Sequence, residues 1–176
     1  DTEAVTTTAT TTAPTGTAVL NAADPLVAGM AGAVAGAVLF FAADPDHPTL
    51  ARHRAAGGLT AFVRAGVLTL AEGAAETPVL PAADAPLARG GRVAFQVENA
   101  LAAAAAAWRL GVPPEVIAAG LRTFADAPGR FTVFERDGAA VVVDYAHNPS
   151  AVAALAAGLA AFPHPHRTLV FSGSNR

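Results

Sequence analysis

Side chains that could hold an anionic ligand occur in two short stretches near the end of the chain. Asp144, His147 and Asn148 follow an apolar run directly, and Arg130 lies in the preceding stretch 128–131. A guanidinium binds paired oxygens, and a carboxylate accepts hydrogen bonds from hydroxyl groups. The continuously apolar run predicts a buried strand, and the residues from Ser150 onward predict a helix. Open α/β sheets bind ligands in such loops between a strand end and a helix start.

The same residues also allow a simpler interpretation. Asp144 and His147 could form a local turn network without a ligand, because polar loop residues commonly bond their own backbone. Arg130 could be one half of a surface ion pair. His164 and His166 have no acidic or cysteine neighbours at a ligand spacing, so a solvated loop is preferred there over a metal site.

The hydrophobic pattern predicts the elements that would position these residues. Strands are predicted at 17–20, 37–41, 59–63, 67–70, 79–80, 131–136, 139–143 and 168–171, and helices at 25–35, 49–56, 96–110, 114–124 and 150–162. The first strand, helix and strand predict a parallel sheet with buried apolar strands. The turn at 64–66 predicts a β-hairpin. The fold class is therefore α/β.

Composition divides the chain into three parts. Residues 1–15 are rich in threonine and lack a hydrophobic period, so we expect a ragged end. Residues 16–126 carry the signals of an α/β domain. The loop at 125–129 contains proline and glycine and precedes a change from helix to strand signals, which places a domain boundary there. Residues 127–176 would then begin a second domain.

Charge and composition exclude several classes of function. The net charge is −3 and there is no basic run, so neither nucleic acid nor an anionic membrane is an expected partner. The apolar stretch 22–43 contains Asp24, Pro25 and glycines, which predicts a helix and a strand rather than a membrane span. Without cysteine there is no disulfide, and a cytoplasmic location fits best. Without lysine, a P-loop lysine would have to come from outside these residues.

Four stretches together resemble one superfamily. The string 144–149, preceded by Pro128-Gly129-Arg130-Phe131, resembles the nucleotide-contacting region of the Mur ligase and folylpolyglutamate synthetase superfamily. The stretches 15–25 and 90–103 are similar to the Mur-type module of the cyanophycin synthetase family within it. The resemblance covers roughly residues 14–176. It departs from the family pattern in the threonine tract, at Ala23 in place of a usual aspartate, and at the end of the chain.

This resemblance implies both a fold and an activity. Residues 16–126 would be the C-terminal part of a Mur ligase central domain, and residues 127–176 the first part of a Rossmann-like C-terminal ligase domain. The implied reaction is ATP-dependent amide or isopeptide bond formation through an acyl phosphate, with ATP and Mg²⁺ as cofactors. Its substrates would be an amino acid and a carboxylate acceptor, namely arginine and poly-aspartate in the cyanophycin synthetase family. The full-length enzyme could form a homo-oligomer.

The resemblance also implies roles for individual residues, none of them catalytic. Asn99 would bind the adenine, because an amide offers a donor and an acceptor together. Gln96, one helical turn earlier, would share that face. Arg130 would contact phosphate or ribose, Asp144 would accept from ribose hydroxyls or help to order Mg²⁺, and His147 would lie beside the phosphates.

Two alternative functions remain open. One is a cell-wall or folate ligase of the same superfamily, which would share every residue named above. The other is a truncated nucleotide-binding remnant without catalysis, suggested by the missing lysine and triphosphate loop. On any of these readings the chain by itself is expected to be inactive.

Overall fold

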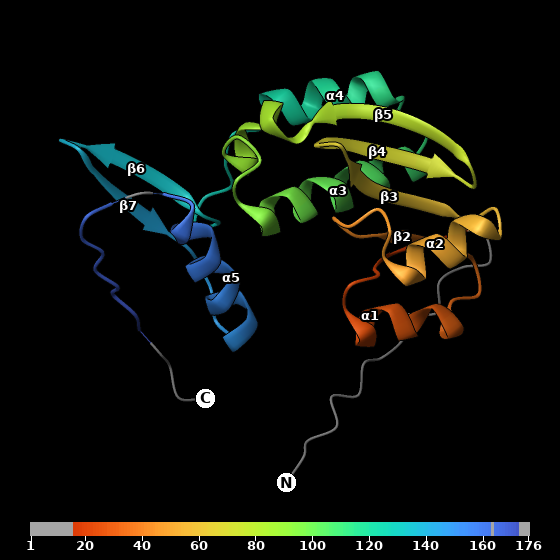
Figure 1. The fold of residues 1–176 in the computed structure, drawn as a ribbon, viewed down its shortest axis with the longest axis horizontal. Coiled ribbons are helices and arrows are strands. Elements are labelled where there is room, and N and C mark those ends of the chain that lie inside the picture. The colour runs from red at the N-terminus through yellow and green to blue at the C-terminus, as the bar shows by residue number, and fades with distance from the viewer. Residues whose placement is uncertain (1–15, 163, 173–176) are drawn as a thin grey trace, which may run out of the picture.

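The computed structural model describes residues 16–162 and 164–172, and Figure 1 shows their arrangement. The strands are β1 (Thr17–Asn21), β2 (Ala37–Phe41), β3 (Leu59–Arg64), β4 (Val67–Glu72), β5 (Ala75–Pro81), β6 (Thr132–Arg136) and β7 (Ala139–Val143). The α-helices are α1 (Pro25–Gly29), α2 (Pro48–Ala55), α3 (Ala94–Arg109), α4 (Pro114–Thr123) and α5 (Pro149–Ala160). None of the described helices is long and apolar enough to cross a membrane. The predicted ragged end, residues 1–15, lies outside the described residues.

Strands β1 to β5 form one sheet in sequential order. The pairs β1–β2 and β2–β3 are parallel, which confirms the α/β prediction for the first strands. The pairs β3–β4 and β4–β5 are antiparallel. The reversal after β3 follows from its two-residue turn, where Ala65 and Gly66 both have positive φ, at 50° and 80°. Such a turn matches the twist of a tight hairpin.

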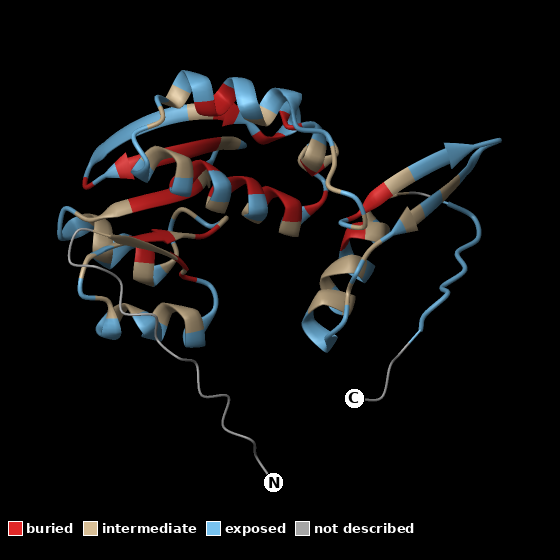
Figure 2. Cartoon of the chain, turned by 180° about the vertical axis from the view of Figure 1, so that it is seen from behind, coloured by how far each residue is buried: buried red, intermediate tan, exposed pale blue. Residues whose placement is uncertain are grey.

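Helices cover both faces of this sheet, so the core has two parts. Helix α3 packs against β1, β2 and β3 on one face, where Leu39, Leu70 and Leu101 are buried. Helix α2 lies on the other face, over a core that includes Leu50 and Phe62. Figure 2 shows the buried residues concentrated in the central strands and in α3. Alanines along the inner side of α3 allow its backbone to approach the strands closely.

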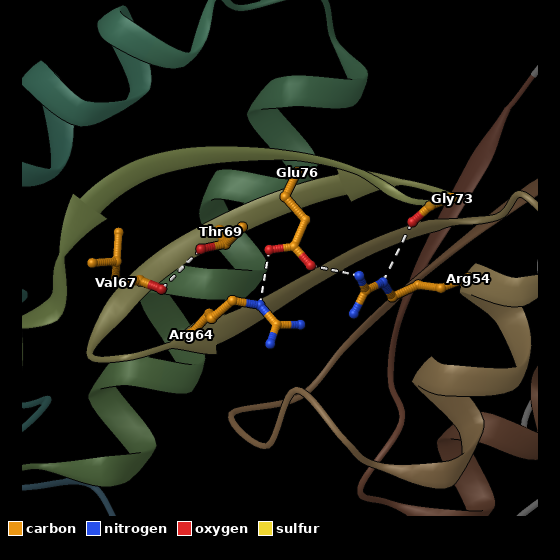
Figure 3. Close-up of polar contacts among 6 residues, drawn as sticks. All are labelled: Arg54, Arg64, Val67, Thr69, Gly73 and Glu76. Carbon is orange, nitrogen blue, oxygen red and sulfur yellow. Dashed lines mark hydrogen bonds and ion pairs between the residues drawn. The ribbon is translucent and has the colours of Figure 1, made fainter.

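Three charged side chains join helix α2 to strands β3 and β5 (Figure 3). Glu76 accepts from Arg54 through one carboxylate oxygen and from Arg64 Nε through the other, at 2.8 Å for Arg64. The two guanidinium groups also lie over the buried Phe62 ring, 4.6 and 5.1 Å from its centroid. This cluster therefore covers an aromatic side chain while it holds three elements together.

The hairpin β6–β7 forms a separate two-stranded sheet beside the larger one, with α5 packed next to it (Figure 1). Its register pairs Thr132 with Val143, as the predicted hairpin requires. The position of a domain boundary between residues 126 and 127 remains a prediction. Helix α3, which packs on the larger sheet, contacts helix α5 on the other side of this predicted boundary.

Three predictions about elements need correction. The strand predicted at 168–171 is not formed, and Leu169, Val170 and Phe171 are exposed. Strand β7 alternates between exposed and half-buried residues instead of being buried throughout, because β6 is its only strand partner among the described residues. The helix predicted at 25–35 is the five-residue α1 followed by a 3-10 turn ending at Ala33. The glycines at 29 and 32 disfavour a longer α-helix.

Candidate functional site

A cavity of about 1040 Å³ lies between α3, α4 and the loop from β7 to α5. One part of its wall is apolar and comes from the facing sides of α3 and α4. The other part is polar and comes from the N-terminal half of α3, the turn at 130 and the loop after β7. All five residues assigned to ligand binding from the sequence line this one cavity: Gln96, Asn99, Arg130, Asp144 and His147.

The turn before β6 is held in an uncommon backbone conformation. Phe131 is a non-glycine residue with φ at 58°, and its ring is buried. Asp144 Oδ2 accepts a hydrogen bond from the Phe131 backbone N–H at 2.8 Å. The Tyr145 N–H donates to the Gly129 carbonyl at 3.0 Å. The end of β7 thus fixes the turn that carries Arg130, and Asp144 uses one of its two oxygens to do so.

Arg130 is exposed to the cavity and to solvent. Its guanidinium lies 5.2 Å from the centroid of the Tyr145 ring. Within residues 16–162 and 164–172, no carboxylate forms an ion pair with it. The alternative interpretation as a surface ion pair is therefore not what the described residues show. The guanidinium keeps its donors available for a ligand with paired oxygens.

The loop after β7 contains a local network of the kind that the alternative interpretation anticipated. His147 Nδ1 lies 3.2 Å from the Tyr145 carbonyl oxygen, and the two rings are tilted at a centroid distance of 5.2 Å. Asn148 Oδ1 caps α5 by accepting from the Ala151 N–H and the Ser150 hydroxyl, both at 2.8 Å. Asn148, Ser150 and Ala151 line the cavity, so the first turn of α5 borders it. The residues of this local network therefore also line the cavity.

Gln96 and Asn99 do not share one exposed face of α3. Gln96 is only 2% exposed, whereas Asn99 is exposed. Gln96 Nε2 donates to the Arg130 carbonyl at 3.1 Å, and its Oε1 accepts from Asn99 Nδ2 at 3.0 Å. The amide of Gln96 thus links the helix to the turn, and Asn99 is the member of the pair that reaches the open cavity.

Glu98 lines the cavity, although no role was predicted for it from the sequence. It is half-buried, and desolvation raises the pKa of its carboxyl above the usual 4.5. In the part of the chain that is described, no cation pairs with it. The position of Glu98 directly before Asn99 was the one sequence feature that could have suggested a place near the ligand. Helix periodicity alone, however, does not tell which neighbouring element a side chain will face.

The described residues contain no group of three histidine, aspartate or glutamate side chains able to hold a metal ion. Glu98, Asp144 and His147 all line the cavity, but they do not form such a group. His164 and His166 are exposed in the segment after α5, as a solvated loop predicts. This part of the chain does not, on its own, fit a Mg²⁺ site.

Comparison with known proteins connects this chain to one superfamily. Residues 129–176 match the family model described as Mur ligase, glutamate ligase domain. Cyanophycin synthetase from Synechocystis sp. is 41% identical over 141 residues, which cover 78% of this chain and 16% of that protein. The enzyme of the same name from Crocosphaera subtropica is 40% identical over 139 residues, 77% of this chain and 16% of that protein. The chain belongs to the Mur ligase superfamily.

Further similarity to Mur ligases is found in sequence and in structure. UDP-N-acetylmuramate–L-alanine ligase from Roseiflexus castenholzii is 47% identical over 77 residues, 43% of this chain and 16% of that protein. A crystal structure of MurF from Acinetobacter baumannii matches with a TM-score of 0.58 at 24% identity, over 85% of this chain and 30% of that one. The structural match concerns the fold alone. The chain spans about 16% of the length of the curated Mur ligase relatives named above.

Proposed function

We propose that the cavity binds the adenine nucleotide of an ATP-dependent acid–amino-acid ligase. One observation carries the proposal. Residues 96–99 of α3 and residues 130–147, far apart in sequence, converge on one cavity with the donors and acceptors that a nucleotide requires. The relatives in the superfamily are named as ligases, which supports the class of enzyme. Their activity concerns much longer proteins, so its transfer to this chain is part of the proposal.

The residues divide into a base-binding and a phosphate-binding group. Asn99 would bind the base, against the apolar wall of α3 and α4. Arg130 would bind phosphate or ribose oxygens, and the first turn of α5 would favour negative charge nearby. His147 and the free oxygen of Asp144 would complete the polar side. A cavity of about 1040 Å³ offers ample room for a nucleotide.

When bound, ATP supplies the phosphoryl group that activates the acceptor carboxylate, which an amino-acid amine then attacks. This chain's contribution would be to bind and orient the nucleotide and to exclude water from its base. The Mg²⁺ that accompanies ATP would need ligands beyond the described residues, because these offer no cluster for it. We therefore assign no metal-binding role to Asp144. A cytoplasmic location belongs to the same proposal.

For the substrates we propose arginine as the incoming amino acid and the aspartate side chains of poly-aspartate as the acceptor. The support is the 41% identity to cyanophycin synthetase over most of this chain. A second candidate is a cell-wall ligase, favoured by the 47% identity to the L-alanine ligase, although over a shorter stretch. The nucleotide-side residues would be the same in both cases.

The test uses an intact ligase that includes this chain. ATP-dependent phosphate release is measured with arginine and a poly-aspartate primer, with L-alanine and UDP-N-acetylmuramate, and with each amino acid alone. We expect release only with arginine and primer together, accompanied by a mass increase of the primer. Release with the cell-wall pair would favour the second candidate. No ATP-dependent amide formation with any pair would overturn the assignment as a ligase.

A further inference from the structure

The hydrogen bonds between α3 and the turn at 130 determine which way two amide groups point. The backbone carbonyl of Arg130 is an acceptor and cannot donate. The Gln96 side chain lies 3.1 Å from it, so the group of Gln96 that faces it must be the NH₂ group. The oxygen Oε1 of Gln96 must then face the other way, toward Asn99.

The orientation of the Gln96 amide in turn constrains the amide of Asn99. Because Gln96 presents an oxygen, Asn99 must turn its own NH₂ group toward it, and the two atoms lie 3.0 Å apart. Asn99 Oδ1 is thereby left on the cavity side, together with the second N–H of its amide. The backbone carbonyl of Arg130 thus sets the orientation of the exposed Asn99 amide through the side chain of Gln96.

Burial makes this orientation costly to reverse. Gln96 is 2% exposed, so water cannot easily replace either of its partners. Flipping its amide would place two oxygens against each other at Arg130 and two NH₂ groups against each other at Asn99. An unsatisfied buried polar group costs more than an ordinary hydrogen bond contributes. Asn99 alone, being exposed, would have no such preference.

We propose that Gln96 is a positioning residue that holds the Asn99 amide with its oxygen toward the cavity, so that the site selects a purine with an amino group at position 6. This rests on the proposed function. An oriented asparagine amide pairs with adenine by accepting from its amino group and donating to a ring nitrogen. A 6-oxo purine such as hypoxanthine or guanine would place an oxygen against Asn99 Oδ1. The site would thus discriminate between 6-amino and 6-oxo purines by the orientation of the Asn99 amide and not by the area of contact with the base.

The experiment compares ATP with inosine triphosphate, which differs from ATP in carrying a 6-oxo group. Both are titrated into the 176-residue chain, and binding is followed by NMR shifts of its backbone amides, a method suited to dissociation constants on the order of millimolar. We expect the wild type to bind ATP more tightly than inosine triphosphate. In Gln96→Leu the ratio of the two dissociation constants should move toward one by about threefold to tenfold, which corresponds to the loss of one hydrogen bond. Asn99→Ala should lose it as well.

The double variant separates positioning from a general structural role. If Gln96 acts through Asn99, then Gln96→Leu should change the ratio of the two dissociation constants in the wild type but not in Asn99→Ala. Arg136→Ala, at the exposed end of the β6–β7 hairpin, is the matched control and should keep the wild-type ratio. An unchanged ratio in Gln96→Leu, or an equal change in both backgrounds, would overturn the inference.

A measurement on the wild type covers the case in which Gln96→Leu does not fold. Without nucleotide, scalar couplings should be observable across two hydrogen bonds, from Gln96 Nε2 to the Arg130 carbonyl and from Asn99 Nδ2 to the side-chain carbonyl of Gln96. Absence of the second coupling would contradict the inference directly. Absence of any nucleotide-induced shift at the cavity would instead overturn the proposed function, while the amide signals would still decide the orientation.

Discussion

Asp144 supports the turn before β6 and also lines the cavity, so we propose that it serves both the fold and the ligand. One of its oxygens accepts from the Phe131 N–H and so supports a non-glycine residue at positive φ. The other oxygen is the one that we propose to face the nucleotide. In an intact ligase, Asp144→Ala and Arg130→Ala should each lower turnover by about tenfold to a thousandfold, as loss of a charge-assisted contact does. Steady-state kinetics at saturating and limiting ATP provide the measurement.

Asp144→Asn separates the two tasks. The asparagine oxygen can still accept from Phe131 N–H, so the melting temperature of this variant should stay close to that of the wild type, whereas that of Asp144→Ala should fall. Turnover should drop in both variants because both lack the negative charge. Wild-type kinetics in Arg130→Ala and Asp144→Ala alike would show that these residues do not serve the nucleotide.

Glu98 should lower the stability of the free protein near neutral pH. Desolvation raises the pKa of its carboxyl, so the folded protein keeps a proton that the unfolded chain releases above its pKa of 4.5. The free energy of unfolding therefore falls as the pH rises through the window between the unfolded and the folded pKa. Glu98→Gln removes the charge at nearly constant shape and should raise the melting temperature at pH 7.

The pH dependence provides the check on this prediction. Below pH 4.5 the Glu98 carboxyl is protonated in both the folded and the unfolded protein. The gain in melting temperature from Glu98→Gln should therefore shrink there. Glu135→Gln, at an exposed position of strand β6, is the control and should leave the melting temperature at pH 7 unchanged. A melting temperature of Glu98→Gln equal to that of the wild type near pH 7 would mean that burial of Glu98 does not destabilise the fold.

Among the elements, the contact between α2, β3 and β5 depends on Glu76. Its two ion pairs are partly exposed, with side-chain exposures of 18% for Arg54, 43% for Arg64 and 27% for Glu76. Pairs of this kind contribute little individually, but here both arginines also cover Phe62. We expect Glu76→Ala to lower the free energy of unfolding by about 1 kcal/mol in urea titrations.

The matched control is the ion pair of Arg136 with Asp137, whose side chains are 92% and 90% exposed. Asp137→Ala would disturb a residue at positive φ, so Arg136→Ala is the better variant. It should leave the unfolding midpoint unchanged. An equal loss of stability in Glu76→Ala and Arg136→Ala would argue against a special role for the cluster over Phe62.

Local signals were sufficient to predict most elements of this fold. Strand β2 forms at Ala37–Phe41 as predicted, because a short apolar run is bounded by turn residues on both sides. Helix α3 was equally clear, since its alanine-rich run ends before Gly111 and Pro113. The segment 168–171 has the same apolar composition but forms no strand, because a strand also needs a partner. Composition cannot supply that information.

The candidate site was predictable in its members but not in their arrangement. The strand-end position of Asp144 and the stretch with Arg130 indicated that both could serve one ligand, and both line one cavity. Spacing on a helix placed Gln96 and Asn99 on one face. It did not reveal that the turn at 130 buries Gln96 and uses both ends of its amide. Hydrogen bonds between distant segments depend on packing that the local sequence does not encode.

For the molecule as a whole, we expect the 176-residue chain not to form amide bonds. Transfer of a phosphoryl group requires strong cationic binding of the β- and γ-phosphates, and the chain contains no lysine. Arg130 and His147 would contact the nucleotide from one side and leave the triphosphate largely hydrated, so affinity should be on the order of millimolar or weaker. Phosphate release should not depend on arginine or on any other amino acid.

The comparison for this prediction is an intact ligase that includes the chain, assayed under identical conditions. We expect amino-acid-dependent phosphate release from the intact ligase only. If the isolated chain hydrolysed ATP in step with amide formation, a phosphate-binding site without lysine would have to exist within it.

Among the described residues, one edge of β7 has no strand partner, and we expect this edge to affect how the chain behaves at high concentration. Val141 and Val143 on β7, together with Leu169, Val170 and Phe171, present exposed apolar side chains beside backbone groups that no described strand pairs. Bare strand edges of this kind add strands from neighbouring molecules. The chain should therefore self-associate as its concentration rises, and replacing Val141 by lysine should keep light scattering low without altering the five-stranded sheet.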